Sequence, residues 1–237
     1  MMSINGINQW TPELVDTVME SIAVFNSELF PLSILLPLFL ISVTVGLIYY
    51  CYKEPGNKSS NYLKLFLAFV YVISGLHVFV GALFGVMPLP VALIGLSGMW
   101  VVSLLLLMDI YWNKTSFDFT LSNTEYKPVK ITGFALMFTG IVVYPIVEIL
   151  TGFIWPDIVF FMAECPTTIF LIGLLLTAIP KTNKLLILLI GINAVYTGTS
   201  VALMGFPTDL LYAIAGITGI IAMAVYWREI TFSFKTR

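Results

Sequence analysis

Several polar side chains that can bind a small molecule lie inside stretches of sequence that are otherwise apolar. His77 is the one histidine of the chain, and Tyr71 and Ser74 precede it on a similar helical face. At about 1.5 Å per residue, His77 lies roughly 20 Å along its helix from Lys64, which marks the nearer membrane surface. An ionisable residue at that depth is costly in lipid and is typical of a functional site.

A second polar group follows helical spacing on a later apolar stretch. Asn193, Tyr196, Thr197 and Ser200 stand at positions i, i+3, i+4 and i+7. Polar residues of a membrane helix face the bundle interior, because lipid offers them no hydrogen-bond partner. The stripe therefore either lines a cavity or forms hydrogen bonds that hold neighbouring helices together, and both interpretations stay open.

Carboxylates and a proline motif form a third group, near the opposite surface. Glu148 follows Tyr144-Pro145, where the proline is expected to kink the helix. Glu164 precedes Cys165-Pro166-Thr167-Thr168, whose proline fits either a kink or the first position of a helix capped by the cysteine. In the second case the helix begins below the surface, with free backbone N–H groups directed at a pocket. The carboxylates are either a functional entrance for cations or solvated interface residues.

We predict that these groups converge on one polar centre between helices. The candidate substrate-binding residues are Tyr71, Ser74, His77, Tyr144, Glu148, Glu164, Cys165, Thr168, Asn193 and Thr197. Glu148 and Glu164 are expected at the outer entrance of this centre. The prediction requires His77 to face the polar groups of the later helix and not lipid.

The same sequence argues against catalysis and against a bound cofactor. It holds no paired histidines and no Cys-x-x-Cys motif, so no metal site is predicted. It shows no Ser-His-Asp arrangement and no glycine-rich phosphate loop, so no enzymatic activity is expected. A retinal Schiff base is excluded because the last apolar stretch contains no lysine. Cys51 and Cys165 are expected on opposite sides of the membrane, too far apart for a disulfide.

The composition is that of a membrane protein. The chain is 59% hydrophobic and 10% charged, whereas soluble domains carry about 25% charged residues. A spanning helix needs about 20 apolar residues, and seven stretches suit this role: 29–52, 62–86, 88–112, 130–152, 160–180, 184–205 and 208–228. We therefore predict an all-α integral membrane protein with seven transmembrane helices. It forms a single domain over 1–237, with helices 1–3 in 29–112, helix 4 in 130–152 and helices 5–7 in 160–228.

The basic residues predict how the chain is oriented. All 11 Lys and Arg residues fall in the first, third and fifth gaps between these stretches, within three residues of those gaps, or near the C-terminus. Cytoplasmic loops collect Lys and Arg, so the N-terminus is predicted outside and the tail 229–237 inside. The net charge of −2 and the absence of a basic patch indicate no nucleic-acid partner.

The segment before the first span is predicted to be an amphipathic helix on the outer membrane surface, over 11–28. Thr11 suits the N-cap and Pro12 the first helical position. The apolar residues Leu14, Val18, Ile22 and Phe25 recur at helical spacing. The alternative is a frayed acidic leader. A signal peptide is not expected, because no basic residue precedes the first apolar run.

Two further patterns concern the arrangement of the spans. Helices 1–3 and 5–7 contain similar features in the same order, which suggests a 3+1+3 parallel repeat with helix 4 as the connector. The matching features are the helix starts Phe30-Pro31 and Cys165-Pro166, the turns Gly85-Val86-Met87-Pro88 and Gly205-Phe206-Pro207, the glycine pairs Gly95 with Gly98 and Gly216 with Gly219, and the helix ends Tyr111-Trp112 and Tyr226-Trp227. Residues 115–121 alternate at strand period, as do 230–235. These two segments either pair as a small sheet or are both flexible.

Cys165-Pro166-Thr167-Thr168-Ile169-Phe170, with Gly173-Leu174-Leu175 after it, resembles the signature of a prokaryotic family of polytopic membrane proteins that is classified only as a domain of unknown function. Tyr144-Pro145 and the entry from Phe25-Asn26 through Pro31 look like the same family, so the likeness spans nearly the whole chain. Where that family tends to show a histidine after the Tyr-Pro helix, this chain has Phe153. The resemblance implies a multi-pass protein of the prokaryotic inner membrane and carries no activity with it.

These observations leave more than one function open. The first hypothesis is a small secondary transporter or permease for a small solute or cation, with a polar site between two repeats. The second is a non-catalytic structural subunit or scaffold of a larger membrane complex, and a receptor is third. The expected partners are the lipid bilayer, an unknown small solute, and either a membrane-protein partner or further copies of the chain. A transporter should enclose a polar central cavity, whereas a scaffold should be packed dry there.

Overall fold

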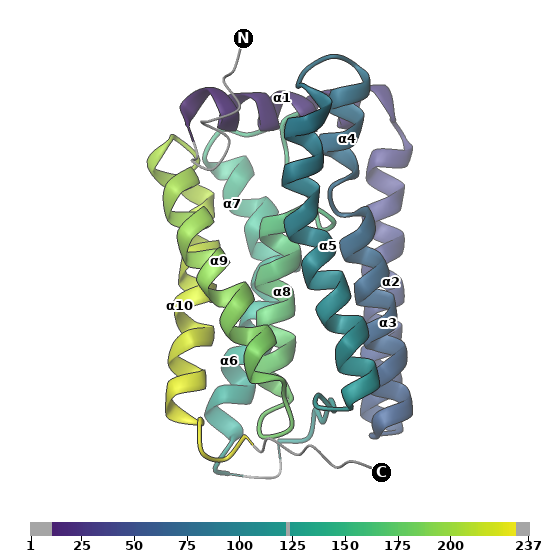
Figure 1. Ribbon diagram of the computed structural model, residues 1–237, viewed down its shortest axis with the longest axis vertical. Helices are drawn as coiled ribbons and strands as arrows, with labels where there is room; N and C mark the ends of the chain where they lie inside the picture. The colour runs from purple at the N-terminus through teal and green to yellow at the C-terminus, as the bar shows by residue number, and fades with distance from the viewer. Residues whose placement is uncertain (1–10, 122–123, 231–237) are drawn as a thin grey trace.

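The computed structural model of the protein describes residues 11–121 and 124–230, which form a bundle of helices (Figure 1). In chain order the elements are α1 Pro12–Glu28, α2 Leu32–Lys53, α3 Asn57–Ile73, α4 Leu76–Leu83, α5 Leu89–Trp112, α6 Lys127–Phe138, the π-helix η2 Thr139–Val143, α7 Tyr144–Leu150, α8 Glu164–Thr177, α9 Lys184–Leu203, the 3₁₀ helix η3 Pro207–Asp209 and α10 Leu210–Val225. Within the described ranges there is no strand, so the predicted all-α class is confirmed.

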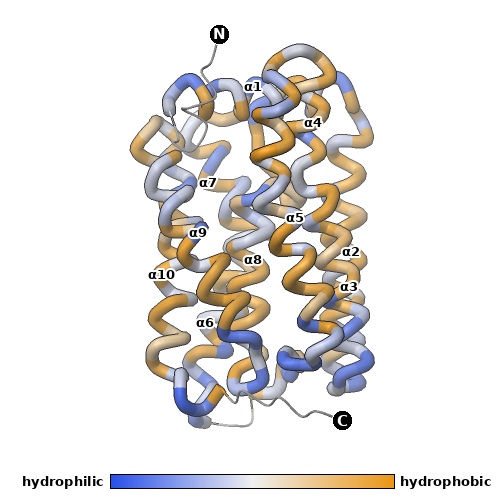
Figure 2. Tube along the Cα trace, viewed as in Figure 1, coloured by the Kyte–Doolittle hydropathy of each residue, from blue (hydrophilic) through white to orange (hydrophobic). Residues whose placement is uncertain are grey.

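Among the described residues, six helical segments are long and apolar enough to cross a membrane. They are Leu32–Lys53, Asn57–Leu83, Leu89–Trp112, Lys127–Leu150, Lys184–Leu203 and Pro207–Val225. Each coincides with one of the predicted spans to within a few residues. The remaining predicted span, 160–180, corresponds to α8, which has only 14 residues. Hydrophobic residues run along the helices, and hydrophilic residues gather at the two ends of the bundle (Figure 2).

The short helix α8 forms the centre of the bundle. Every residue from Pro166 to Thr177 is buried, whereas the longer α2 buries only 5 of its 22 residues. At about 1.5 Å per residue α8 is roughly 20 Å long, less than the roughly 30 Å of a bilayer core. It therefore begins part-way into the bundle, and residues 151–163, the α7–α8 loop, lead down to it from the end of α7 (Figure 1).

Glycines allow α6 and the π-helix to pack directly against α8. A Cβ atom on Gly133 would lie 2.6 Å from the backbone oxygen of Gly173, and one on Gly140 would lie 2.4 Å from the oxygen of Pro166. Small residues at such positions let membrane helices approach closely enough for extensive van der Waals contact. Gly198 approaches the backbone of α10 in the same way. The second half of the chain is therefore a tightly packed group around α8.

Helix α1 lies across one end of the bundle (Figure 1). The predicted helix and its cap are present: the helix starts at Pro12, and the Thr11 side chain caps it by accepting a hydrogen bond from the backbone N–H of Leu14. The buried face differs from the predicted stripe, because Val15 and Asn26 are buried whereas Leu14 and Val18 are half-buried. Leu14 and Val18 instead line a cavity that lies beneath the helix.

Two of the spans are interrupted in the half of the bundle that is nearer to α1. The first break, at Ser74 and Gly75, separates α3 from α4; the Ser74 hydroxyl donates to the carbonyl of Val70, which is a known cause of helix bending. The second break is the π-helix η2, which ends just before Pro145. The expected kink at this proline therefore takes the form of a widened turn, since proline cannot donate the regular backbone hydrogen bond.

The turns after α4 and α9 are built alike. Gly85 and Gly205 have φ values of 78° and 108°, a backbone conformation that favours glycine. The following residue of each turn donates to a carbonyl five positions earlier: Val86 to Gly81, and Phe206 to Val201. This is the hydrogen-bond pattern of a Schellman motif. The two turns occupy corresponding places in the suggested repeat.

The end of the bundle opposite α1 is held by a buried ion pair. Lys64 of α3 contacts Asp109 of α5 at 3.0 Å, and both side chains are almost completely inaccessible. Asp109 also accepts hydrogen bonds from the side chain of Asn183 at 2.9 Å and from the backbone N–H of Thr115 at 3.1 Å. Asn183 caps α9. The ion pair therefore joins α3, α5 and the start of α9 at this end.

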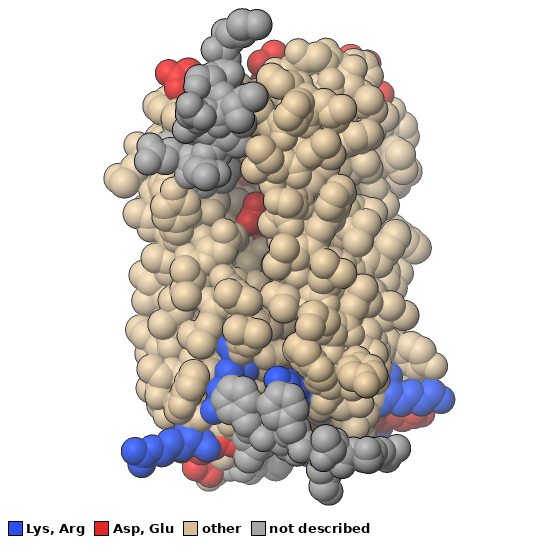
Figure 3. Space-filling view, viewed as in Figure 1, with Lys and Arg blue, Asp and Glu red and all other residues tan. Residues whose placement is uncertain are grey.

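Residues 115–121 are not a strand, although their predicted alternation is present as burial: Thr115, Phe117 and Phe119 are buried. The proposed partner strand falls largely in 231–235, outside the described residues. Figure 3 shows Lys and Arg at the end of the bundle opposite α1, which we name the basic end, although Asp and Glu lie there too. At the end near α1 the charged residues in view are Asp and Glu, and we name it the acidic end.

Candidate functional site

A cavity of about 450 Å³ lies between the first and second halves of the chain. Its walls come from α1, α4 and α5 on one side and from α7, the start of α8, α9 and the turn at Pro207–Asp209 on the other. It extends from beneath α1 to about the middle of α5 and α9, where Met99 and Asn193 line it. Figure 3 shows acidic atoms in the recess between the two halves, about midway between the ends.

Seven of the ten predicted site residues line this cavity: His77, Tyr144, Glu148, Glu164, Cys165, Asn193 and Thr197. The other three lie elsewhere in the core. The hydroxyls of Tyr71 and Thr168 are hydrogen-bonded to each other at 2.8 Å, which joins α3 to α8. Ser74 is bonded to its own helix, as described above. These three residues hold helices in place and do not reach the cavity.

Glu164 is the carboxylate at the first position of α8. Its Oε1 accepts hydrogen bonds from the side-chain amide of Asn193 at 2.9 Å and from the hydroxyl of Tyr212 at 3.3 Å. No described residue donates a hydrogen bond to its Oε2. The residue is partly exposed and lines the cavity. The prediction that α8 begins below the surface beside a pocket agrees with this position, but the helix starts before Cys165, and Pro166 is its third residue.

Asp209 is a second carboxylate of the cavity, and it is missing from the predicted set. It is 5% exposed and accepts a hydrogen bond of 2.6 Å from the hydroxyl of Tyr144. The Cys165 thiol lies within hydrogen-bond reach of it. Asp209 follows a Gly-Phe-Pro turn, and a carboxylate beside a turn is usually solvated, so its burial in the cavity wall was not predicted. Tyr212, one turn later on α10, was missed for the same reason.

Glu148 is the third carboxylate, and its role is tied to the α7–α8 loop. Its Oε2 accepts a hydrogen bond of 2.6 Å from the backbone N–H of Val159. The same loop is held from α1, because the Asn26 amide donates to the carbonyls of Pro156 and Ile158. Irregular backbone at this depth is tolerated where it is buried in protein or lines a cavity. Glu148 and Asn26 satisfy polar groups that the loop would otherwise leave without partners.

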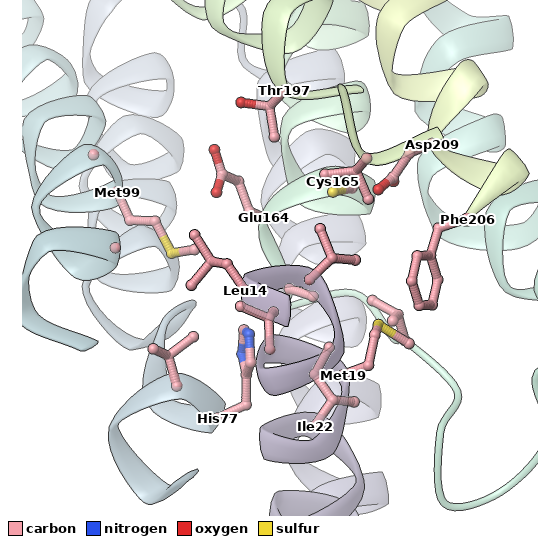
Figure 4. Close-up of a pocket in the computed structure, with 18 of the residues that line it drawn as sticks. Leu14, Met19, Ile22, His77, Met99, Glu164, Cys165, Thr197, Phe206 and Asp209 are labelled. Atoms are coloured by element: carbon pink, nitrogen blue, oxygen red, sulfur yellow. The ribbon is translucent and has the colours of Figure 1, made fainter. Parts of the chain in front are cut away.

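His77 and Thr197 face the cavity from opposite sides (Figure 4). Both are buried, at 6% and 5% exposure. The backbone of Ser74 lies near the His77 ring, and no side chain of a described residue is hydrogen-bonded to that ring. The Thr197 hydroxyl has no hydrogen bond within the described part of the chain, and Figure 4 shows it on the side of the Glu164 carboxylate. His77 lines the same cavity as Asn193 and Thr197.

The remaining cavity wall is apolar. It includes Val91, Ile94 and Met99 of α5, Met19 of α1, and Phe206. Gly95 and Gly98 also line it, and an added Cβ at Gly98 would meet no atom within 4 Å. Among the described residues no group of three His, Cys, Asp or Glu side chains is arranged to hold a metal ion. The site is therefore a mainly apolar cavity with three carboxylates in its wall and a few polar atoms that have no hydrogen-bond partner among the described residues.

Comparison with known protein families matches residues 15–236 to a family described as a family of unknown function (DUF6064). The match covers nearly the whole chain, so the protein belongs to this family. The expectation of an uncharacterised family is thereby confirmed, although the match carries neither a function nor a location. No curated protein matches the chain, and no solved structure matches it.

Proposed function

We propose that the protein is a small secondary transporter or permease for a small solute or cation in the prokaryotic cytoplasmic membrane, and that it has no enzymatic role. The observation that carries this proposal is the cavity of about 450 Å³ between the two halves, with Glu148, Glu164 and Asp209 in its wall. Carboxylates at such depth mark substrate or ion pathways in membrane proteins. The volume falls within the range of about 300–1,000 Å³ that is usual for small-molecule sites.

The proposal includes seven membrane crossings, with the acidic end outside and the basic end inside. The positive-inside rule supports this orientation. Helix α8 is too short to cross alone, so the α7–α8 loop and α8 together make one crossing. Part-helices of this kind, with a helix N-terminus near the midplane, are typical of substrate sites in transporters.

The two ends of the bundle differ in a way that suits alternating access. The basic end is closed by the Lys64–Asp109 pair and its bond to Asn183, whereas the cavity lies in the half near α1. In the proposed cycle the two halves rock about the cavity, and the contacts at the basic end break to open the inner side. The matching turns at Gly85 and Gly205 support a parallel repeat. The first helices of the two units, α2 and α8, differ in length and burial. The proposed similarity between the units is therefore greater for their second and third helices than for their first.

The experiment that tests transport fills the cavity without disturbing the packing. Gly98→Phe adds a ring on the cavity wall, where a Cβ meets no atom within 4 Å. Gly46→Phe on α2 is the matched control, because its Cβ also meets no atom within 4 Å and it does not line the cavity. Both variants are reconstituted into liposomes beside the wild type. Uptake of a panel of labelled small solutes and cations is measured under an imposed pH gradient or membrane potential.

We expect at least one solute to enter wild-type and Gly46→Phe liposomes faster than protein-free liposomes, and Gly98→Phe to abolish the difference. Uptake that is equal in wild-type and Gly98→Phe liposomes would show that the cavity is not the route. If no solute is taken up and the protein is recovered from membranes in a stable complex with other proteins, the structural subunit is the correct function.

A further inference from the structure

We infer that the cavity binds a small protonated amine with an apolar body, and that the Glu164 carboxylate is the counter-charge of the ammonium group. This inference rests on the proposed function and names the substrate class of the same site. It follows from four features of the cavity: its charge, the unused oxygen of Glu164, the unpartnered polar atoms beside it, and its apolar wall.

The charge of the lining excludes an anion. Glu148, Glu164 and Asp209 line the cavity, and no Lys or Arg does so among the described residues. In a cavity shielded by apolar helices, charges are screened less than in water, so the sign of the lining carries more weight than it would at a surface. A cationic ligand compensates the carboxylates, whereas an anion is repelled.

Glu164 is the carboxylate that remains free to bind. Glu148 is almost fully buried and already accepts the Val159 N–H at 2.6 Å. Asp209 is likewise buried and accepts the Tyr144 hydroxyl at 2.6 Å. Within the described part of the chain, Glu164 accepts hydrogen bonds only at Oε1, from Asn193 and Tyr212. These two donors hold the carboxylate in one orientation, and Oε2 is left for a ligand.

A second observation points to a ligand independently of the carboxylates. The Thr197 side chain is almost fully buried, with the residue 5% exposed, yet its hydroxyl has no hydrogen bond to any described residue and faces the cavity beside Glu164 (Figure 4). Buried polar groups without partners are rare, because each costs free energy comparable to a lost hydrogen bond. Together with Glu164 Oε2, this hydroxyl offers two acceptors to one N–H-bearing cation. The His77 ring, on the opposite wall, offers a further nitrogen without a hydrogen-bond partner among the described residues.

The apolar wall identifies the rest of the ligand. Val91, Ile94, Met99 and Phe206 enclose most of the space around the polar atoms, which suits a hydrocarbon body attached to the ammonium group. A bare metal cation does not suit it: Ca²⁺ takes six to eight oxygen ligands and Mg²⁺ six, and no metal-holding group occurs in the described ranges. A fully methylated ammonium would leave both acceptors unused, so the amine carries at least one N–H.

The test measures binding and not transport. The full-length protein in lipid nanodiscs is titrated by calorimetry with phenethylammonium chloride, with its neutral analogue 2-phenylethanol, with the anion 3-phenylpropanoate, and with potassium chloride. We expect only phenethylammonium to bind and to raise the melting temperature. Equal or tighter binding of 2-phenylethanol or 3-phenylpropanoate, or no binding of phenethylammonium, would overturn the inference.

Variants locate the binding. Glu164→Gln removes the counter-charge but keeps an oxygen for Asn193 and Tyr212, and we expect it to weaken phenethylammonium binding at least about tenfold, since hydrogen bonds to charged groups are the stronger ones. Thr197→Val is nearly isosteric and removes a hydroxyl that has no hydrogen-bond partner among the described residues. We expect it to weaken binding by about two- to tenfold while the melting temperature without ligand stays unchanged. Glu28→Gln, exposed on α1 and outside the cavity, is the control and should bind as the wild type does.

The outcomes separate this inference from the proposed function. Phenethylammonium that binds with the expected variant pattern but is not transported in the liposome assay would support the site and contradict the transporter. Transport of a neutral or anionic solute that Gly98→Phe abolishes would support the transporter and contradict the amine. Unchanged binding by Glu164→Gln and Thr197→Val would also overturn the inference, because the ammonium would then lie elsewhere.

Discussion

The hydroxyl of Tyr144 donates a hydrogen bond of 2.6 Å to Oδ1 of Asp209, and this contact joins α7 to η3, directly before α10. Both side chains are almost completely buried, at 2% and 5% exposure. Tyr144 follows directly after the π-helix that precedes Pro145, so the irregular turn lies next to the residue that positions Asp209. The contact fixes one wall of the cavity from within the second half of the chain.

Tyr144→Phe should therefore destabilise the protein. The change removes the donor and leaves the Asp209 carboxyl buried without that partner, which costs about 1–3 kcal/mol. The free energy of unfolding is measured by denaturant titration in mild detergent. Tyr111→Phe is the control, because Tyr111 is 85% exposed, and it should leave stability unchanged. Equal stability of the two variants would contradict the structural importance of the bond.

The buried ion pair at the basic end gives a larger effect. Lys64→Met leaves the Asp109 carboxylate buried without its counter-charge, and breaking a buried pair on one side costs about 3–5 kcal/mol. Adding Asp109→Asn to this variant removes the uncompensated charge while keeping an oxygen for Asn183 and Thr115. We expect the double variant to be more stable than Lys64→Met alone. If the second change lowers stability further, the two charges are not coupled as the 3.0 Å contact indicates.

Tyr71 and Thr168 distinguish hydrogen bonds between helices from the binding site. A double-mutant cycle with Tyr71→Phe and Thr168→Val should give a coupling free energy of about 0.6–1.7 kcal/mol, as found for such bonds between membrane helices. Neither single variant should change the affinity for phenethylammonium, because neither residue lines the cavity. A loss of affinity without a loss of stability would move these residues into the site.

The six long apolar helices were predictable because the length and hydropathy of such a segment can be read from the sequence without knowledge of tertiary contacts. Hydropathy does not reveal that α8 is buried among other helices whereas α2 is largely exposed. A helix surrounded by other helices and a helix surrounded by lipid are equally apolar, so composition does not separate them. The usable signals are the glycines at 133, 140 and 173, which allow backbone contact, and the short distance from Glu164 to Lys181, which leaves too few residues for a full span.

The site was predictable where a polar residue lies deep in an apolar run, as His77, Asn193 and Thr197 do. It was not predictable where the chain returns into the bundle through a loop. Asp209 lies beside a turn, and its burial depends on how η3 packs against α7 and α9. Asp109 lies near the basic end, where a carboxylate is ordinarily solvated, and only the fold brings Lys64 and Asn183 to it.

A pH-dependent contribution is expected from Asp118, in the segment after α5. Burial raises the pKa of this carboxyl, but hydrogen bonds from Thr120 and the ammonium of Lys130 at 3.7 Å outweigh it, so the pKa lies below its ordinary value. A lowered pKa contributes stability above the unfolded-state value of about 3.9 that is lost as pH falls through the folded-state value. The wild type should therefore melt higher than Asp118→Asn at pH 7, and the difference should shrink below about pH 4. A difference that is constant between pH 7 and pH 3 would contradict this assignment.

The close approach of η2 to α8 predicts that alanine changes the stability of the protein in opposite directions at two glycines. Gly140→Ala places a methyl group 2.4 Å from the oxygen of Pro166 and 2.8 Å from the backbone nitrogen of Phe170. Because both neighbours are backbone atoms, the helices must separate, and overpacking of this kind costs about 1–3 kcal/mol. Gly46→Ala on α2 is the matched change, since its methyl group meets no atom within 4 Å, and alanine favours a helix over glycine by about 1 kcal/mol.

Unfolding of both variants is measured under the same detergent and denaturant conditions. Gly140→Ala should be less stable than the wild type and Gly46→Ala equally or more stable; a Gly140→Ala variant as stable as the wild type would mean that α8 is not packed backbone to backbone at the centre of the bundle.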